Sequence, residues 1–174
     1  MHTWRDADQI TRLHELARAK DDPDPKALAC YGVLLRRRPL QADQMLLRFV
    51  DGRPVSAVTI DFLTWCCERL AAQGVTAWLL IWDNASWHKS QAVRSWIRNH
   101  NQTVKHTGQV VRIVPCLLPS KSPWLNPIEP KWIHGKRAIS EPDRMLSALE
   151  VEERVCAYYG CPREVHLLMP EKVA

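Results

Sequence analysis

The apolar run from Thr76 to Trp82 constrains the fold of this chain more than any other segment. An uninterrupted run of this kind is typical of a strand covered on both faces, as in a layered α/β domain. A helical pattern over His88–Asn101 and a second apolar run over Val110–Leu118 follow it. Strand, helix and strand with a connection of this length predict two parallel strands joined by a right-handed crossover. Because Pro115 has no N–H to donate, the second strand is expected at a sheet edge.

The other segments predict that this pair of strands belongs to a larger α/β domain. Two apolar runs joined by a polar loop indicate antiparallel strands, and a glycine after a periodic segment indicates the end of a helix. Residues 1–26 are polar, and their "KDDPDPK" cluster is incompatible with regular structure, so they are interpreted as a lead-in to one domain over residues 27–174. The further elements are strands at Ala27–Leu35 and Met45–Asp51, a helix from Ser56 that stops at Gly74, a helix that starts after Asn126, and a helix over Arg144–Tyr159.

Composition and targeting signals predict a soluble protein. Hydrophobic residues make up 46% of the chain, and the longest apolar run, Ala77–Trp82, is far shorter than the roughly 20 residues of a membrane helix. The N-terminus lacks the apolar stretch of a signal peptide. We therefore expect a cytoplasmic protein that is associated with the nucleoid when it binds DNA. The six cysteines are expected as small buried side chains in a reducing compartment.

Cys156, Cys161 and His166 form a weak candidate for a structural zinc site. Their C-x4-C-x4-H spacing fits none of the common zinc patterns, and no fourth ligand is evident. We therefore expect packing roles for these residues rather than metal binding.

Positive charge is concentrated in the second half of the chain. Residues 84–137 hold nine Lys or Arg against one acid, Glu129, so this segment carries +8; with a net charge of +5 the remainder carries −3. A segment this basic attracts polyanions such as DNA, with an affinity that falls as salt is added. The alternative is a solvated helix face, which is the usual role of such a run.

Two acids follow the predicted parallel strands, and together they suggest a metal site. Asp83 ends the first strand, and Glu129 lies in the segment that leaves the second. Parallel neighbours are ~4.8 Å apart, and open α/β sheets bind ligands beyond the carboxyl ends of their strands. Mg²⁺ is bound by one or two carboxylates together with waters and phosphate oxygens. A pair of such ions about 4 Å apart activates a water or 3′-hydroxyl for displacement at phosphorus.

Each of these residues also has an ordinary structural interpretation. Asp83 fits a turn or N-cap acid, and Glu129 fits the acid of a capping box with Asn126 as N-cap and Pro127 at the first helical position. A lone histidine such as His88 is more often a structural hydrogen-bonding group than a catalyst. Two tryptophans near the second acid, Trp124 and Trp132, are more often core residues than stacking platforms.

The stretches "IWDNASWH" and "LPSKSPWLNPIEPKW" resemble the second and third acidic motifs of DDE-superfamily transposases, in the bacterial insertion-sequence branch related to the mariner group. The resemblance covers Ala27–Ile139 and implies a ribonuclease-H-like fold. It implies that Asp83 and Glu129 are metal-binding and catalytic carboxylates, that Asn84 and His88 support the site, and that Trp124, Asn126 and Pro127 shape the loop before Glu129.

The same resemblance implies a reaction and its partners. The family uses Mg²⁺ (or Mn²⁺) to cleave DNA at transposon ends and to join the freed 3′-hydroxyl to target DNA. DNA is then the expected partner of the basic segment, with contacts from Lys89, Lys121, Lys131, Lys136 and Arg137.

The chain departs from the family pattern at its N-terminus. The family's first aspartate ends the first, central strand of the sheet, but no segment before Ala27 has the pattern of a buried strand ending in an acid. Asp6 and Asp8 are the early candidates, and they lie in polar, helix-like sequence. The interval between Asp83 and Glu129 is longer than is usual in the group, and a helix-turn-helix for transposon ends is missing. We expect the C-terminal part of a transposase, truncated before its central strand and inactive alone.

Three functions follow from these observations. The first is metal-dependent DNA cleavage and strand transfer that requires completion by the missing part. The second is a non-enzymatic remnant that binds DNA, or that associates with a full-length transposase or with itself as a dimer. The third is an RNA-cleaving nuclease of the ribonuclease H type, since a fold does not determine its substrate.

Overall fold

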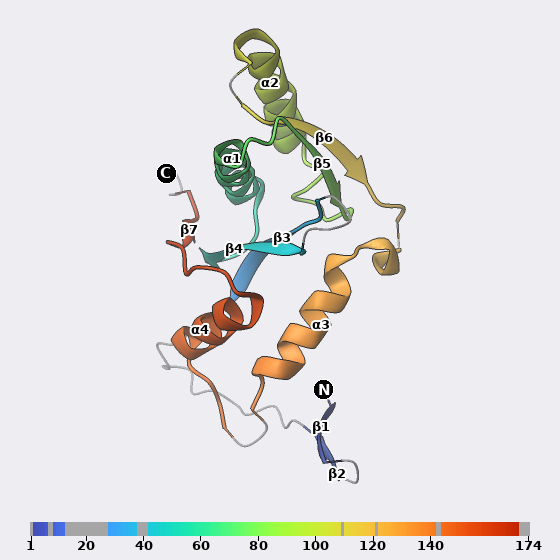
Figure 1. Ribbon diagram of the computed structural model, residues 1–174, viewed down its shortest axis with the longest axis vertical. Helices are drawn as coiled ribbons and strands as arrows, with labels where there is room; N and C mark the ends of the chain where they lie inside the picture. The colour runs from blue at the N-terminus through green and yellow to red at the C-terminus, as the bar shows by residue number, and fades with distance from the viewer. Residues whose placement is uncertain are drawn as a thin grey trace.

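The computed structural model describes residues 2–6, 9–12, 28–37, 42–108, 110–120, 122–141 and 144–170. The described residues form both strands and helices (Figure 1), so the predicted α/β class is confirmed. The elements are β1 (His2–Asp6), β2 (Gln9–Arg12), β3 (Ala29–Leu35), β4 (Gln44–Asp51), α1 (Ser56–Ala72), β5 (Ala77–Trp82), α2 (Gln91–Thr107), β6 (Arg112–Leu117), the 3₁₀ turn η1 (Pro123–Leu125), α3 (Ile128–Ile139), α4 (Ala148–Tyr159) and β7 (Leu167–Leu168).

The antiparallel hairpin of β3 and β4 is confirmed, with Tyr31 opposite Arg48 and Leu35 opposite Gln44. β7 adds in parallel to the end of β4. α1 follows and presents an apolar stripe at helical spacing to this hairpin and to β5. Its buried side chains are Val58, Thr59, Phe62, Leu63, Cys66, Cys67 and Leu70.

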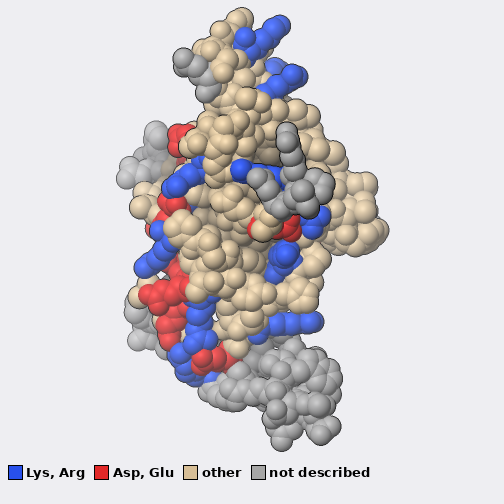
Figure 2. All heavy atoms as spheres, in the orientation of Figure 1, with Lys and Arg blue, Asp and Glu red and all other residues tan. Residues whose placement is uncertain are grey.

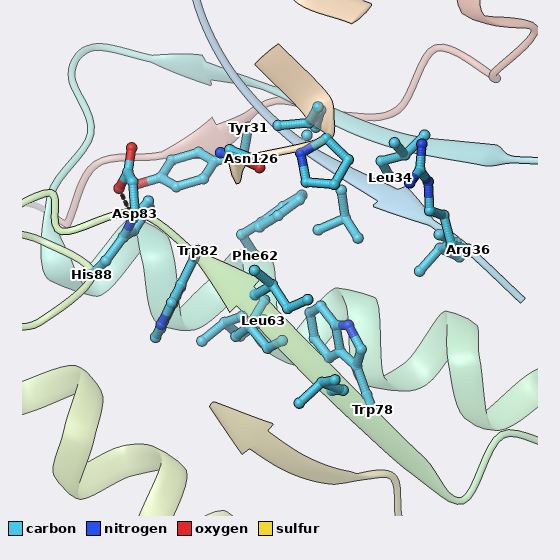
Figure 3. Close-up of a pocket in the computed structure, with 18 of the residues that line it drawn as sticks. Tyr31, Leu34, Arg36, Phe62, Leu63, Trp78, Trp82, Asp83, His88 and Asn126 are labelled. Carbon is cyan, nitrogen blue, oxygen red and sulfur yellow. Dashed lines mark hydrogen bonds and ion pairs between the residues drawn. The ribbon is translucent and has the colours of Figure 1, made fainter. Parts of the chain in front are cut away.

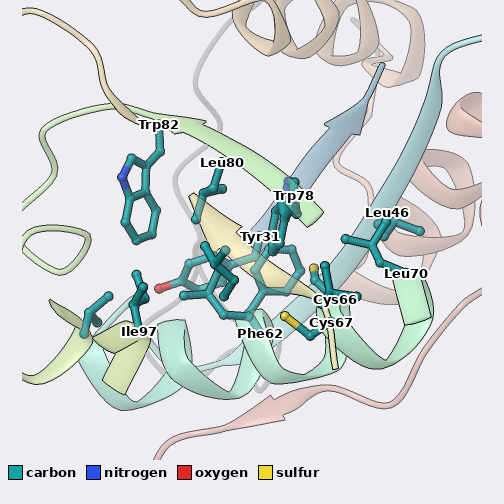
Figure 4. Close-up of a cluster of buried hydrophobic side chains, with 14 of the residues drawn as sticks. Tyr31, Leu46, Phe62, Cys66, Cys67, Leu70, Trp78, Leu80, Trp82 and Ile97 are labelled. Atoms are coloured by element: carbon teal, nitrogen blue, oxygen red, sulfur yellow. The ribbon is translucent and has the colours of Figure 1, made fainter. Parts of the chain in front are cut away.

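The parallel pair is also confirmed, because β5 and β6 run side by side with Leu80 opposite Pro115. β6 has β5 as its one partner among the described strands, so the expected edge position is confirmed as well. The prediction that β5 is covered on both faces is wrong. Leu79 and Ile81 are 59% and 44% exposed, because α1 and α2 cover one face and no described element covers the other. Trp78, Leu80 and Trp82 point to the covered face, toward Phe62 and Ile97 (Figure 4).

The strands form separate sheets rather than one mixed sheet. β3, β4 and β7 make one sheet, β5 and β6 make another, and β1 with β2 makes a third. Buried residues of α1 nevertheless join β3 and β5 in one hydrophobic core. Over the described residues, the result is a ribonuclease-H-like α/β fold that lacks a full sheet, as the sequence predicts.

The N-terminal residues differ from the sequence-based interpretation. Residues 2–6 and 9–12 form an antiparallel hairpin, with Thr3 opposite Thr11, where helix-like sequence was expected. Threonine, isoleucine and tryptophan favour extended backbone, and this preference outweighs the helical pattern. The "KDDPDPK" cluster, Lys20–Lys26, lies outside the described residues.

The two C-terminal helices begin differently from the prediction. The capping box expected at Asn126 and Glu129 is wrong, because Pro127 is the N-cap of α3 and no side chain caps this helix. A capping box does form at α4, between Ser147 and Glu150. α4 starts four positions beyond the predicted Arg144, where Ser147 provides this cap. Among the described residues, no helix combines the length and apolar content needed to cross a membrane.

Close packing places α3 against β3. Gly32 of β3 leaves no room for a side chain, since a Cβ there would lie 2.4 Å from the Trp132 ring of α3. The same ring makes an edge contact with Tyr159 of α4, with centroids 5.5 Å apart. Glycine at position 32 therefore allows the helix that carries Glu129 to approach the sheet.

Candidate active site

A pocket of about 640 Å³ lies between β3 and β5 and reaches the start of α3. Figure 3 shows Asp83, His88 and Asn126 at one end of this pocket and Leu34, Arg36 and Trp78 toward the other. The structure thus brings five of the predicted site residues to one cavity: Asp83, His88, Asn126, Pro127 and Glu129.

Asp83 is the first residue after β5, and its carboxylate is oriented by two donors. Its Oδ1 accepts from the backbone N–H of Ala85 (2.9 Å) and from the Nδ1–H of His88 (2.7 Å). The side chain is 51% exposed, and no hydrogen bond from a described residue reaches Oδ2. The bond to Ala85 is that of an ordinary turn acid, so the interpretation of Asp83 as a turn acid is confirmed. A free oxygen on a fixed carboxylate is available to an external ligand.

His88 is held in place by aromatic contacts. Its ring stacks on Trp82 with centroids 4.9 Å apart and an interplanar angle of 13°, and it makes an edge contact with Trp87 at 5.9 Å. Trp82 belongs to β5, so the imidazole is fixed relative to the strand that ends at Asp83. Sequence reasoning did not include Trp82 and Trp87 in the site; their adjacency to the Asp83 motif was the available signal.

Asn84 fastens the ends of the two parallel strands together. Its side-chain amide donates to the carbonyl of Leu118, while the N–H of Leu118 donates to the carbonyl of Trp82 (2.9 Å). The amide does not line the pocket. Its contacts fix the segment that leaves β6 against the segment that leaves β5.

Glu129 reaches the pocket from the first turn of α3. Its backbone N–H donates to the carbonyl of Asn126 (3.1 Å), and its side chain is half-buried. Its carboxylate makes no hydrogen bond or ion pair with a described residue. The capping function that would have explained this acid is therefore absent, and an acid in the first turn is favoured by the helix dipole.

The two tryptophans near Glu129 have different environments. Trp132 is packed between Gly32 and Tyr159, so the core interpretation holds for it. The same interpretation is wrong for Trp124, which lies in η1 and is 75% exposed. Trp124 is therefore an exposed aromatic ring five residues before Glu129.

The predicted DNA-binding cations that the structure describes all lie on the surface. Lys89, Lys136 and Arg137 are exposed, Lys131 lies 3.9 Å from the Asp43 carboxylate, and Lys121 is outside the described residues. In the view of Figure 2, basic side chains are spread from the α2 end to the opposite end, where acidic side chains lie among them. The excess of charge in residues 84–137 thus does not form one continuous patch on this face.

The residues fit a hard metal ion only in part. Asp83 and Glu129 offer carboxylate oxygens, which Mg²⁺ prefers and which leave positions for waters and phosphate oxygens. Within the described part of the chain, no three Asp, Glu, His or Cys residues are grouped to hold a metal ion. Asp6 is the last residue of β1, where only the backbone is described, and Asp8 lies outside the described residues.

His166, one of the three residues of the weak zinc candidate, takes part in an ion-pair network. His166 donates to Asp51, and its Nε2 lies 2.7 Å from Glu152 without hydrogen-bond geometry. Arg163 also pairs with the buried Glu152 (2.8 Å). The expected burial of cysteines is correct for Cys66, Cys67 and Cys156, and wrong for Cys116, which is exposed on β6.

An incomplete ribonuclease-H-like fold with an aspartate after β5 and a glutamate at the start of α3 defines a nuclease-type α/β domain. The family model described as DDE superfamily endonuclease matches residues 40–151, which is more than half of the chain. This chain therefore belongs to the DDE superfamily of endonucleases. No curated protein and no solved structure gives a significant match.

Proposed function

We propose that this chain is the catalytic part of an insertion-sequence transposase, which cleaves DNA at transposon ends and joins the 3′-hydroxyl to target DNA. The convergence of Asp83 and Glu129 on one pocket is the observation that carries this proposal. Membership of the DDE superfamily supports a nuclease acting on DNA. The proposal that the chain also joins DNA strands, in addition to cleaving DNA, rests on the two acidic motifs.

Asp83 and Glu129 would hold Mg²⁺ or Mn²⁺, which activates the attacking oxygen and stabilises the leaving oxygen at phosphorus. The protein's own contribution is orientation. His88 and the N–H of Ala85 hold one oxygen of Asp83 and leave the other toward the ligand. Asn84 keeps the strand ends together, and Pro127 starts the helix that delivers Glu129.

DNA contacts are proposed for exposed cations near Asp83 and on α3, the helix that carries Glu129. Lys89 follows His88 directly, while Lys136 and Arg137 lie in the last turn of α3. Each phosphate contact would make binding weaker at higher salt. Lys131 contributes less, because Asp43 already lies within ion-pair distance.

We further propose that the chain alone is inactive, because two carboxylates do not complete the three-acid site of this superfamily. The lack of a three-residue metal cluster in the described part of the chain supports this. The same observation favours one alternative, a non-enzymatic fragment that binds DNA or a full-length transposase. Metal binding separates the two, since a binding fragment has no need of an ion.

Titration calorimetry with Mg²⁺ and Mn²⁺ tests the proposal. Wild type is expected to bind Mn²⁺ at millimolar concentration, and Asp83→Asn and Glu129→Gln are each expected to weaken binding about tenfold or more, since a charged oxygen ligand is lost. Glu153→Gln, an exposed acid on α4, is the matched control and should bind as wild type does. Equal binding by all four proteins would contradict the metal site.

A plasmid nicking assay with Mg²⁺ tests the inactivity. The chain alone is expected to leave supercoiled plasmid intact. Efficient nicking that Asp83→Ala abolishes would contradict the claim of inactivity, and a third carboxylate would then have to be sought within the chain.

A further inference from the structure

The C-terminal end of α4 brings two cysteines together. Gly160 has a left-handed backbone (φ 64°), and its N–H donates to the carbonyl of Ala157 (3.3 Å). The N–H of Cys161 donates to the carbonyl of Cys156 (3.0 Å), which completes the hydrogen-bond pattern of a Schellman motif. In this motif the side chains at these two positions frequently touch. Both cysteines are free thiols.

The backbone geometry at this helix end is compatible with a disulfide. The 3.0 Å hydrogen bond keeps the Cα atoms of Cys156 and Cys161 within about 7 Å of each other. Disulfides usually join Cα atoms that are about 4.4–6.8 Å apart. The S–H of Cys161 donates back to the carbonyl of Cys156, with Sγ and O 3.8 Å apart. The S–H of Cys156 donates to the carbonyl of Pro162 (3.9 Å), so each thiol is directed toward the segment that carries the other.

Contacts on both sides of the two cysteines hold this geometry in the folded chain. On the helix side, the hydroxyl of Tyr159 donates to the carbonyl of Lys131 on α3 (2.8 Å). On the other side, Arg163 pairs with the buried Glu152 (2.8 Å), and the segment continues to β7, which pairs with β4 (Figure 1). The two thiols therefore need little rearrangement to react with each other, which favours an intramolecular reaction.

The two thiols differ in access to solvent. Cys161 is half-buried, whereas Cys156 is buried. Burial, the neighbouring Cys156 and a hydrogen bond to its thiol raise the pKa of Cys161 to about 12, and burial also raises the pKa of Cys156. Because the thiolate is the attacking form, reaction is slow at neutral pH. The same property makes each sulfur a poor leaving group, so a disulfide between them resists reduction.

We propose that Cys156 and Cys161 form a redox-sensitive pair, which a small disulfide such as oxidised glutathione converts to an intramolecular disulfide. The Cys161 thiolate attacks the oxidant, which gives a mixed disulfide and releases one reduced glutathione. The Cys156 thiolate then attacks the Sγ of Cys161 and releases the second. Two electrons pass to the oxidant, and the two thiol protons end on the released glutathiones.

The disulfide would close the junction between α4 and the segment that leads to β7. Its effect would be to stabilise the end of the helix on which Tyr159 holds α3. The inference goes beyond the proposed function and is independent of it, since neither metal binding nor DNA cleavage involves these thiols.

Equilibration of the full chain in glutathione redox buffers at about pH 8.5 tests the proposal. After an acid quench and alkylation with N-ethylmaleimide, both cysteines lie in one tryptic peptide, residues 155–163. The disulfide is detected as this peptide without alkyl groups and without glutathione. Half-oxidation in the folded chain is expected at a GSH²/GSSG concentration ratio at least about tenfold higher than in chain unfolded in urea, because the fold holds the pair together.

Two variants complete the test. In Cys156→Ser, Cys161 is expected to stop at the mixed disulfide with glutathione. Cys116→Ser, which removes an exposed cysteine on β6, is the matched control and should oxidise at residues 155–163 as wild type does. The wild-type comparison of folded and unfolded chain stands even where a variant fails to fold.

Three results would overturn the redox-sensitive pair. The first is an equal midpoint of oxidation in the folded and the unfolded chain. The second is retention of both thiols in a buffer that attaches glutathione to the exposed Cys116. The third is a disulfide between this peptide and Cys30 of β3, the competing partner. Burial, and after it the nearby Cys156 and Cys161, raise the pKa of Cys30 to about 12.

Discussion

At the scale of single residues, the site depends on how Asp83 is held rather than on its burial. The carboxylate is half exposed, yet Ala85 and His88 both hold the same oxygen. Groups that orient a metal ligand typically change metal affinity 10–100-fold when they are lost. In the proposed metal site, His88 would act as a positioning residue, and its stacking on Trp82 holds its ring in place.

His88→Phe keeps an aromatic ring over Trp82 and removes the N–H that holds Asp83. We expect Mn²⁺ affinity to fall about tenfold while the melting temperature changes little. His106→Ala, an exposed histidine at the end of α2, is the control. An unchanged affinity in His88→Phe would show that Asp83 needs no such support.

Cysteine reactivity reports on the core. Burial raises the pKa of Cys67 to about 12 and that of Cys66 well above its ordinary value, whereas Cys116 is exposed. Since the thiolate is the reactive form, iodoacetamide at about pH 8 should label Cys116 first and leave the pair on α1 unmodified. Peptide mapping by mass spectrometry measures the order, and early labelling of Cys66 would contradict the described core.

At the scale of secondary structure, side chains of α2 seal one sheet edge. Asn101 satisfies both outward backbone groups of Ile113, which is 1% exposed. Asn101→Ala is expected to lower the free energy of unfolding by about 1–3 kcal/mol, because buried polar groups lose their partners. Asn99→Ala, exposed on the same helix, should stay within about 0.5 kcal/mol of wild type. Urea denaturation measures both values.

The start of α4 should be sensitive to acid. Hydrogen bonds from Arg144 and from Ser147 lower the pKa of Glu150 from 4.5 to about 2. A depressed carboxyl pKa stabilises the fold above the unfolded value and loses this effect as pH falls toward the folded value. Glu150→Gln should therefore melt below wild type near pH 7 and equal it near about pH 2. Glu153→Gln should follow wild type throughout, and a constant difference between Glu150→Gln and wild type would contradict the assignment.

At the scale of the whole molecule, the sequence predicted the local secondary structure. It did not predict which faces are buried by segments that lie far away in the sequence. The strand–helix–strand unit that ends at Asp83 follows from periodicity and turn residues, and so does the β3–β4 hairpin. An apolar run does not show whether helices cover one face of a strand or both, because that depends on how distant segments pack. No described helix packs on the second face of β5, so Leu79 is exposed. Likewise, Asn126 and Glu129 have capping-box spacing, but η1 changes the backbone that enters α3.

The described strands are divided between separate sheets. Among the described strands, the open edges of β3 and β5 face the pocket that Asp83 and Glu129 also line.

Mn²⁺-induced broadening of backbone amide NMR signals tests the central claim, that Asp83 and Glu129 form one metal site, most directly. We predict that low Mn²⁺ broadens the signals of residues 82–85 together with those of Ile128 and Glu129, and that Asp83→Asn removes both effects. Broadening confined to the acidic start of α4, or of one of the two segments without the other, would contradict the claim.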